Sequence, residues 1–200
     1  SHDTGSAFEA IDAPEDAIIL SSGTWSLFGI KSKEPICTEA SLKANFTNEG
    51  GVGYIRFLKN IMGMWIVNQI AEQENINFIE LIKDLDKSTY RETFDVNDQT
   101  ISAPKNMKAA VLNLLKNNPP KNDLDLFAAI YLSMAKAYKK TCDELEKVTN
   151  RTFNYIYIVG GGAKNTYLNK LVEKETGKKV VALPIEATSL GNIKVQMEAK

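Results

Sequence analysis

Two turns made of small residues are the segments of this sequence best suited to contact a phosphate group. Residues 159–165 read VGGGAKN, which joins the end of an apolar run, three glycines and the start of a helical pattern. Bare backbone at a helix N-terminus can bind an anion through its N–H groups, which favours a nucleotide. The dinucleotide fingerprint requires a third spaced glycine where Asn165 stands, and no Gly-Lys-Ser/Thr of a Walker loop is present. Taken alone, the segment is more typical of an ordinary tight turn between a strand and a helix.

The second turn, at residues 21–24, reads SSGT and joins two apolar runs rich in β-favouring residues. It offers hydroxyls and close backbone to a phosphate but no charge, and by itself it predicts only a β-hairpin. Two such turns, one in an N-terminal hairpin and one after a later strand, are typical of phosphate-clamping folds of the actin type. The pair therefore favours nucleotide binding more than either turn does.

Several polar residues could contact or react with a hydroxyl-rich ligand. The chain opens with His2, Asp3 and Thr4, although a terminus is commonly disordered and Ser-His can be a cloning remnant. Side-chain amides also gather near the glycines, where they suit a hydroxyl-rich ligand and are equally ordinary caps and turn formers. These amides and one neighbouring carboxylate are Asn45, Asn48, Glu49, Asn60 and Asn68.

Composition excludes several classes of partner. The chain has 200 residues, 44% of them apolar, which is enough for one well-packed domain. Its 24 basic and 25 acidic residues leave a net charge of -1, without the basic excess of a nucleic-acid-binding protein. No apolar stretch approaches the roughly 20 residues that cross a bilayer. We therefore expect neither a nucleic-acid partner nor a membrane-spanning role.

Cysteine and histidine usage indicates the compartment and excludes one metal. Cys37 and Cys142 lie far apart in a chain that needs no covalent crosslink, so we expect two reduced thiols of a cytoplasmic protein. A structural zinc site needs several Cys or His ligands at short spacing, and the single histidine is His2. Because the chain starts at Ser1 without methionine or a signal segment, we expect an excised domain.

The periodicity of apolar residues predicts an α/β domain whose mixed sheet is flanked by helices on both faces. We expect a hairpin over residues 17–31, a glycine turn at 48–53, and further strands at 54–57, 155–159 and 179–183. The expected helices cover residues 61–73, 75–85, 107–115, 123–148, 165–176 and 188–196. Within them, Asp123 and Asn165 are predicted N-caps, and Gly177 is a predicted C-terminal stop.

Six strings occur in the order found in a known family and cover nearly the whole chain. They are SHDT at residue 1, SSGTWSL at 21, NFTNEGG at 45, LKNIMGMW at 58, IVGGGAKN at 158 and PIEATSLGN at 184. In these strings the chain resembles the C-terminal, nucleotide-binding half of FGGY carbohydrate kinases. The resemblance implies an actin-like, ribonuclease-H-like ATPase fold, in which residues 1–200 form one ATP-binding domain. The sugar-binding N-terminal domain would be a separate part of the same parent chain.

The resemblance also implies roles for individual residues. Asp3 matches the catalytic base that takes the proton of the attacking sugar hydroxyl, and His2, Thr4 and Asn60 match sugar contacts. The residues implied to contact ATP are Gly23, Thr24, Asn68, Gly160, Gly161 and Gly162. Asn68 departs from the glutamine that relatives usually have there. Magnesium is expected to bridge the phosphate oxygens, mostly through waters and one or two carboxylates, and no protein ligand is assigned to it.

The resemblance is greatest to the members that phosphorylate L-rhamnulose to L-rhamnulose 1-phosphate with ATP. A kinase for another sugar or polyol, such as xylulose, fuculose or glycerol, remains an alternative. So do a non-catalytic actin-like nucleotide-binding module, which would need no base at position 3, and an interaction module without a ligand. Because most sugar contacts would belong to the N-terminal domain, we expect the present chain alone to be inactive or nearly so.

Overall fold

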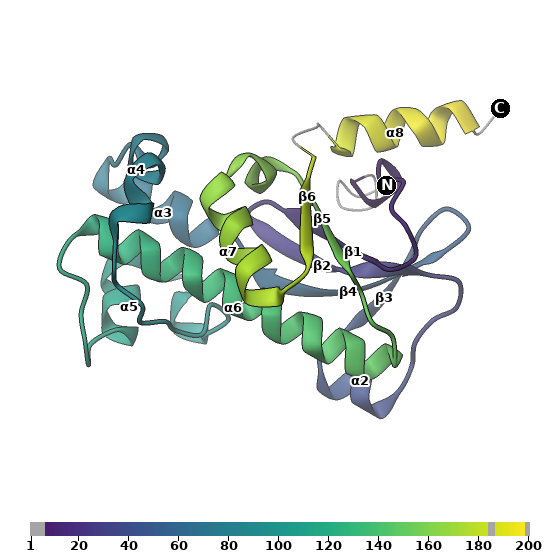
Figure 1. Ribbon diagram of the computed structural model, residues 1–200, viewed down its shortest axis with the longest axis horizontal. Coiled ribbons are helices and arrows are strands. Elements are labelled where there is room, and N and C mark those ends of the chain that lie inside the picture. The colour runs from purple at the N-terminus through teal and green to yellow at the C-terminus, as the bar shows by residue number, and fades with distance from the viewer. Residues whose placement is uncertain (1–6, 184–186, 199–200) are drawn as a thin grey trace.

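A six-stranded mixed sheet forms the centre of the computed structural model, which describes residues 7–183 and 187–198 (Figure 1). Its strands are β1 (Ala17–Ser22), β2 (Trp25–Ser32), β3 (Thr47–Gly50), β4 (Ile55–Met62), β5 (Tyr155–Val159) and β6 (Lys179–Ala182). They lie in the order β3-β4-β2-β1-β5-β6. The mixed sheet flanked by helices that the sequence predicts is confirmed, but the described helices lie mainly on one face of the sheet and not on both as expected.

The parallel pairing of β1 with β5 decides where the two small-residue turns lie. Ser21 pairs with Val159, so both strands end at the same edge of the sheet. β2 then returns antiparallel to β1, with Ser22 opposite Ser26. In α/β sheets, ligands bind in the crevice beyond the carboxyl ends of parallel strands, which is the position of both turns here.

Helices cover one face of this sheet and extend beyond one of its ends (Figure 1). They are α2 (Glu39–Lys43), α3 (Trp65–Glu74), α4 (Phe78–Asp84), α5 (Met107–Leu114), α6 (Asp123–Thr149), α7 (Thr166–Thr176) and α8 (Ala187–Glu198), with short 3₁₀ helices η1 (Leu85–Lys87), η2 (Gln99–Ile101) and η3 (Gly161–Lys164). α6 runs the length of the molecule, and α8 lies at the end opposite α4 and α5 (Figure 1). No helix in the described ranges is long and apolar enough to span a bilayer.

The core lies mainly between the sheet and α6. Tyr138 of α6 is fully buried, stacks on Phe28 with ring centroids 5.9 Å apart, and shares a 2.6 Å hydrogen bond with the Ser26 hydroxyl. A smaller apolar cluster covers the opposite face of the sheet, where Phe8 and Ile11 pack near Leu58. Side chains alternate between the two faces along each strand, so both faces of the central strands are buried.

The signals predicted at both ends of α7 are confirmed. Asn165 caps α7, since its side-chain oxygen accepts a 3.0 Å hydrogen bond from the Leu168 N–H. Gly177 ends that helix in the left-handed conformation at φ +68°, which glycine adopts without steric cost. The start of α6 is shifted by one residue, because the side chain of Asn122 and not Asp123 accepts from the Asp125 N–H.

Three segments differ from the expectation, and in two of them strand pairing overrides the local pattern. The helix predicted over residues 61–73 begins only at Trp65, since Ile61 and Met62 continue β4 in register with β2. The turn predicted at residues 48–53 is partly strand, because Thr47–Gly50 pairs with β4 at the sheet edge. Between β2 and β3, where the sequence pattern predicts no helix, the chain forms α2, which Thr38 caps.

The two cysteines are free thiols, as the sequence predicts, and they differ in environment. Cys37 is exposed, whereas Cys142 is buried in α6 and burial raises its thiol pKa to about 11. The reactive form is the thiolate, so at pH 8 the raised pKa keeps Cys142 protonated as well as inaccessible. We expect iodoacetamide to alkylate Cys37 alone in the native protein and both cysteines in urea, as measured by peptide mass spectrometry. Equal native labelling would contradict this difference.

Candidate functional site

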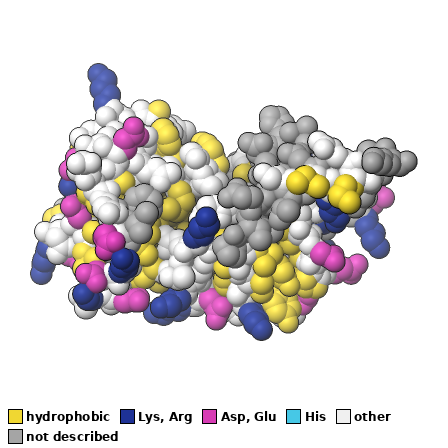
Figure 2. All heavy atoms as spheres, turned by 90° about the horizontal axis from the view of Figure 1, so that it is seen from above, with side chains coloured by type: hydrophobic (Ala, Val, Ile, Leu, Met, Phe, Trp, Pro, Cys, Tyr) yellow, Lys and Arg dark blue, Asp and Glu magenta, His cyan; other side chains and the backbone are white. Residues whose placement is uncertain are grey.

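The turns after β1 and β5 open into one cleft of about 590 Å³. Helices α3 and α4 close one side of it, and η3 with the start of α7 closes another. Figure 2 looks onto this end of the molecule, where the surface is hollowed between the α3–α4 part and the part that carries α8. The cleft is lined by Gly23, Thr24, Met64, Asn68, Ile82, Gly161, Gly162, Lys164 and Asn165.

Two of the three consecutive glycines allow the turns to pack against each other. A Cβ on Gly162 would lie 1.9 Å from the Ser22 Oγ, and a Cβ on Gly160 would lie 2.7 Å from the Ser22 carbonyl oxygen. Gly160 also has φ +82°, a conformation that other residues rarely adopt. A Cβ on Gly161 would meet nothing within 4 Å. Gly161 therefore faces the open cleft. Its lack of a side chain leaves space for a ligand and is not needed for packing between the turns.

A third close approach joins α3 to the hairpin turn. A Cβ on Gly63 would lie 2.6 Å from the Gly23 carbonyl oxygen, so the chain before α3 must be bare there. The Met64 N–H donates to that same oxygen over 2.9 Å, and the Trp65 N–H donates to the carbonyl of Thr24 over 3.2 Å. These contacts dock the start of α3 on the turn and place Asn68, one helical turn later, in the cleft.

The walls of the cleft differ in chemistry. Lys164 carries the only charge among the described residues that line it, so a negatively charged ligand meets no repelling carboxylate. Met64 and Ile82 provide apolar wall. At the start of a 3₁₀ helix, the first N–H groups have no partner within that helix, and the amides of Gly161 and Gly162 stand in that position. The arrangement suits an anion attached to an apolar ring.

The described residues do not form a metal site of their own. In residues 7–183 and 187–198, no three His, Cys, Asp or Glu side chains come close enough together to hold a metal ion. No carboxylate lines the described part of the cleft. Magnesium ions prefer oxygen ligands and commonly bind through one or two carboxylates and phosphates, so the walls described here lack its usual protein ligands.

The cleft brings together most of the residues expected to contact ATP: Gly23, Thr24, Asn68, Gly161 and Gly162 line it. Gly160 lies just behind the wall against Ser22. Asn60 is exposed on β4 opposite Leu27 and does not line this cleft. His2, Asp3 and Thr4 lie outside the described residues.

Four lining residues carry no such expectation from the sequence. Lys164 and Asn165 stand in the same VGGGAKN segment as the glycines, and proximity to them is the signal that could have marked both. Asn165 was expected only as a cap, yet it is 5% exposed and its side-chain nitrogen has no partner in the described part of the chain. Met64 and Ile82 give no signal, because apolar residues in helices are far more often core than ligand wall.

Comparison with known proteins decides the family. Residues 18–199 match the family described as "FGGY family of carbohydrate kinases, C-terminal domain". The chain belongs to this family. A rhamnulokinase from Oceanobacillus iheyensis is 38% identical over 205 aligned residues, which cover 100% of this chain and 44% of that protein. The present chain thus spans less than half the length of this relative.

Solved structures of FGGY kinases share the fold. A ligand-bound xylulose kinase from Lactobacillus acidophilus superposes with a TM-score of 0.67 at 11% identity, covering 98% of this chain and 41% of that one. A Plasmodium falciparum glycerol kinase with ADP superposes with a TM-score of 0.66 at 12% identity, covering 98% and 42%. The actin-like ATPase fold that the sequence resemblance implied is therefore confirmed.

Proposed function

We propose that this chain is the ATP-binding part of a kinase that phosphorylates the ketose L-rhamnulose at O1. The observation that carries the ATP assignment is the single cleft shared by the β1–β2 turn and the β5–α7 turn. The sugar assignment is supported by 38% identity to a rhamnulokinase over the whole chain, compared with 11% and 12% for the xylulose and glycerol kinases. Two free thiols agree with a cytoplasmic enzyme.

In this proposal the cleft holds ATP with its phosphates at the meeting point of the two turns. The Thr24 hydroxyl and the Gly161 amide contact phosphate oxygens, and the Lys164 ammonium offsets part of their charge. The adenosine lies between the backbone at Gly161 and the apolar wall that contains Met64. Phosphoryl transfer has a loose transition state in most analyses, so this positioning and charge neutralisation supply most of the catalysis. Magnesium bound to the phosphates would neutralise further charge.

The sugar would bind on the side of the sheet opposite α6. Asn60 lies two residues after Leu58, so its side chain is on the face where Phe8 packs. Phe8 follows closely the segment with His2, Asp3 and Thr4. We propose that the Asn60 amide and this segment contact the sugar, and that the N-terminal domain of the parent chain completes the site.

In the proposed reaction, O1 of the sugar attacks the γ-phosphorus of ATP. The O1–P bond forms, the bond to the β–γ bridging oxygen breaks, and ADP leaves with that electron pair. Asp3 takes the O1 proton. An ordinary aspartate, with a pKa of about 3.9, is ionised at neutral pH and can accept a proton that is lost late in the transfer.

A substrate panel on the full-length protein tests the sugar assignment. We expect kcat/KM for L-rhamnulose to exceed that for xylulose, fuculose and glycerol by at least about tenfold, because a site built around one set of hydroxyls rejects others. ADP release is measured in a coupled assay. A better rate with another acceptor would overturn the assignment to L-rhamnulose. No turnover with any acceptor, together with tight ATP binding, would indicate a non-catalytic nucleotide-binding module.

A further inference from the structure

A second pocket, of about 330 Å³, lies where α6 and α7 meet the segment of residues 85–91. None of its lining residues lines the larger cleft, although the two sites are neighbours: Ile82 belongs to the cleft wall, and Leu85 begins the wall of the second pocket. The second pocket is lined by Leu85, Asp86, Ser88, Tyr90, Arg91, Ala128, Leu132, Lys136, Tyr167, Lys170, Leu171, Lys174 and Glu175.

The pocket has an apolar floor and a basic rim. Leu85, Ala128 and Leu132 are buried at its base. Its charged lining consists of four basic residues and two acidic ones, a local excess of two positive charges in a chain whose net charge is -1. The basic residues come from three separate elements: Arg91 from the loop after η1, Lys136 from α6, and Lys170 and Lys174 from α7.

Most of these basic side chains are not neutralised. Within the described residues, only Lys170 of the four has a carboxylate within 4.0 Å, the Asp86 carboxylate at 3.7 Å. Lys139, one turn after Lys136 on the same helix, shows the contrast, because it pairs with Asp143 at 2.5 Å. Because no nearby carboxylate offsets the positive potential of such a residue, its attraction for an anionic ligand is not reduced.

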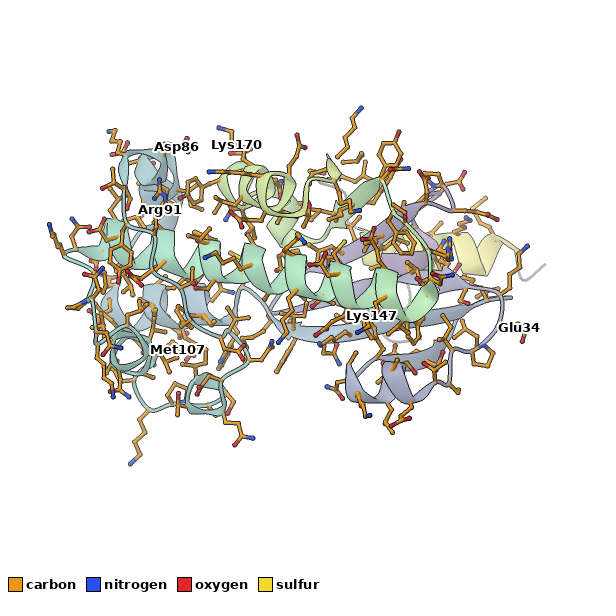
Figure 3. The ribbon with its side chains drawn as sticks, turned by 60° about the horizontal axis from the view of Figure 1, so that its bottom comes forward. Glu34, Asp86, Arg91, Met107, Lys147 and Lys170 are labelled. Carbon is orange, nitrogen blue, oxygen red and sulfur yellow. The ribbon has the colours of Figure 1, made fainter. Side chains whose placement is uncertain are left out.

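The Arg91 guanidinium is held in place without losing its charge. Its Nη1 donates to the carbonyl oxygens of Ser88 and Tyr90, over 3.0 and 2.7 Å. Figure 3 shows Arg91 and Asp86 on the side of the pocket formed by residues 85–91, and Lys170 on the side formed by α7. A guanidinium has five N–H donors in a fixed fork, so donors beyond those on the carbonyls remain for an anion.

The Tyr167 ring forms a half-buried wall of the pocket and packs edge-on against Tyr131, with centroids 5.9 Å apart. Burial raises the pKa of the Tyr167 hydroxyl, which stays protonated and able to donate at neutral pH. An aromatic and aliphatic base under a charged rim is the combination that binds a ligand with an apolar body and an anionic group.

We propose that this pocket is a second ligand site, which binds a small phosphate-bearing metabolite. Arg91, from the loop after η1, and Lys174, from α7, hold the phosphate, and the rest of the ligand lies over Leu132 and the Tyr167 ring. A phosphate group is favoured because two N–H groups of one guanidinium can donate to two of its oxygens, and several lysines together can balance its two negative charges. The volume is at the lower end of the range for small-molecule sites.

Calorimetric titration of the full-length protein with inorganic pyrophosphate, without magnesium, sugar or ATP and at constant ionic strength, tests the site. We expect Arg91→Gln and Lys174→Gln each to weaken pyrophosphate binding roughly tenfold, the usual effect of losing a charged hydrogen bond. Lys140→Gln is the matched control, because Lys140 is an exposed lysine of α6 that lines neither site. Lys164→Gln reports separately on pyrophosphate in the larger cleft. These side chains belong to exposed residues, so the variants should stay folded, and thermal unfolding of each variant checks this.

Weakening by Arg91→Gln and Lys174→Gln, with Lys140→Gln near the wild type, supports the proposal whether or not Lys164→Gln also weakens a separate binding event in the larger cleft. Weakening by Lys164→Gln alone would place the pyrophosphate in the larger cleft and overturn it. Equal affinity in all variants, or no binding by the wild type, would also overturn it. None of these outcomes bears on sugar phosphorylation, since neither sugar nor ATP is present in the titration.

Discussion

Replacing Asp3 with asparagine in the full-length protein is expected to lower kcat by about 10²–10⁴-fold, the usual contribution of a general base. Asparagine keeps the size of the side chain but cannot take the proton that the sugar hydroxyl loses. The KM for ATP should stay near the wild-type value, because the residues proposed to hold ATP belong to the β1–β2 and β5–α7 turns. Steady-state kinetics with L-rhamnulose and ATP measure both quantities.

Asp12→Asn is the matched control for this prediction. Asp12 is an exposed carboxylate in the same N-terminal part of the chain, and it does not line the nucleotide cleft. Its replacement should leave kcat unchanged. Full activity of Asp3→Asn would exclude Asp3 as the base, and an equal loss in both variants would indicate a general effect of charge on this segment.

Gly162→Ala should disrupt the nucleotide site by separating its two halves. The added Cβ would lie 1.9 Å from the Ser22 Oγ and 2.6 Å from the Ser22 Cβ, distances that no structure tolerates without movement. Ser22 is 1% exposed, so it cannot move away from the added methyl group without displacing the atoms around it. Inserting a methyl group into such packing costs about 1–3 kcal/mol of folding free energy, and the displaced turn should raise the KM for ATP at least roughly tenfold.

Gly161→Ala is the neighbouring control, because the same methyl group there meets nothing within 4 Å. Its free energy of unfolding should stay within about 0.5 kcal/mol of the wild type. Any rise in its KM for ATP then reports a methyl group placed in the cleft rather than a loss of packing. Urea unfolding and ATP kinetics of the two variants separate these effects. Equal stability of Gly161→Ala and Gly162→Ala would contradict the packing role of Gly162.

Elements with strong local signals follow the sequence closely. α6 is predictable from its apolar stripe, α7 from Asn165 and Gly177 at its ends, and β5 from five apolar residues bounded by glycine. Local pattern fails where long-range pairing competes with it. Ile61 and Met62 are compatible with helical periodicity, yet eight consecutive pairs between β2 and β4 hold them in a strand. Backbone hydrogen bonds to a distant strand are invisible to a short-range pattern.

Two features of the site can be predicted from residue types alone: the small-residue turns at residues 21–24 and 160–162, and the cap at Asn165. The role of each glycine depends instead on contacts between distant parts of the chain. The parallel pairing of β1 with β5 brings Ser22 against Gly160 and Gly162, and it leaves Gly161 facing open space. The packing of the helices adds Met64 and Ile82 to the cleft and gathers four basic residues in a second pocket. The physical reason is that such contacts join residues far apart in the chain, and their energies depend on distances that no local spacing encodes.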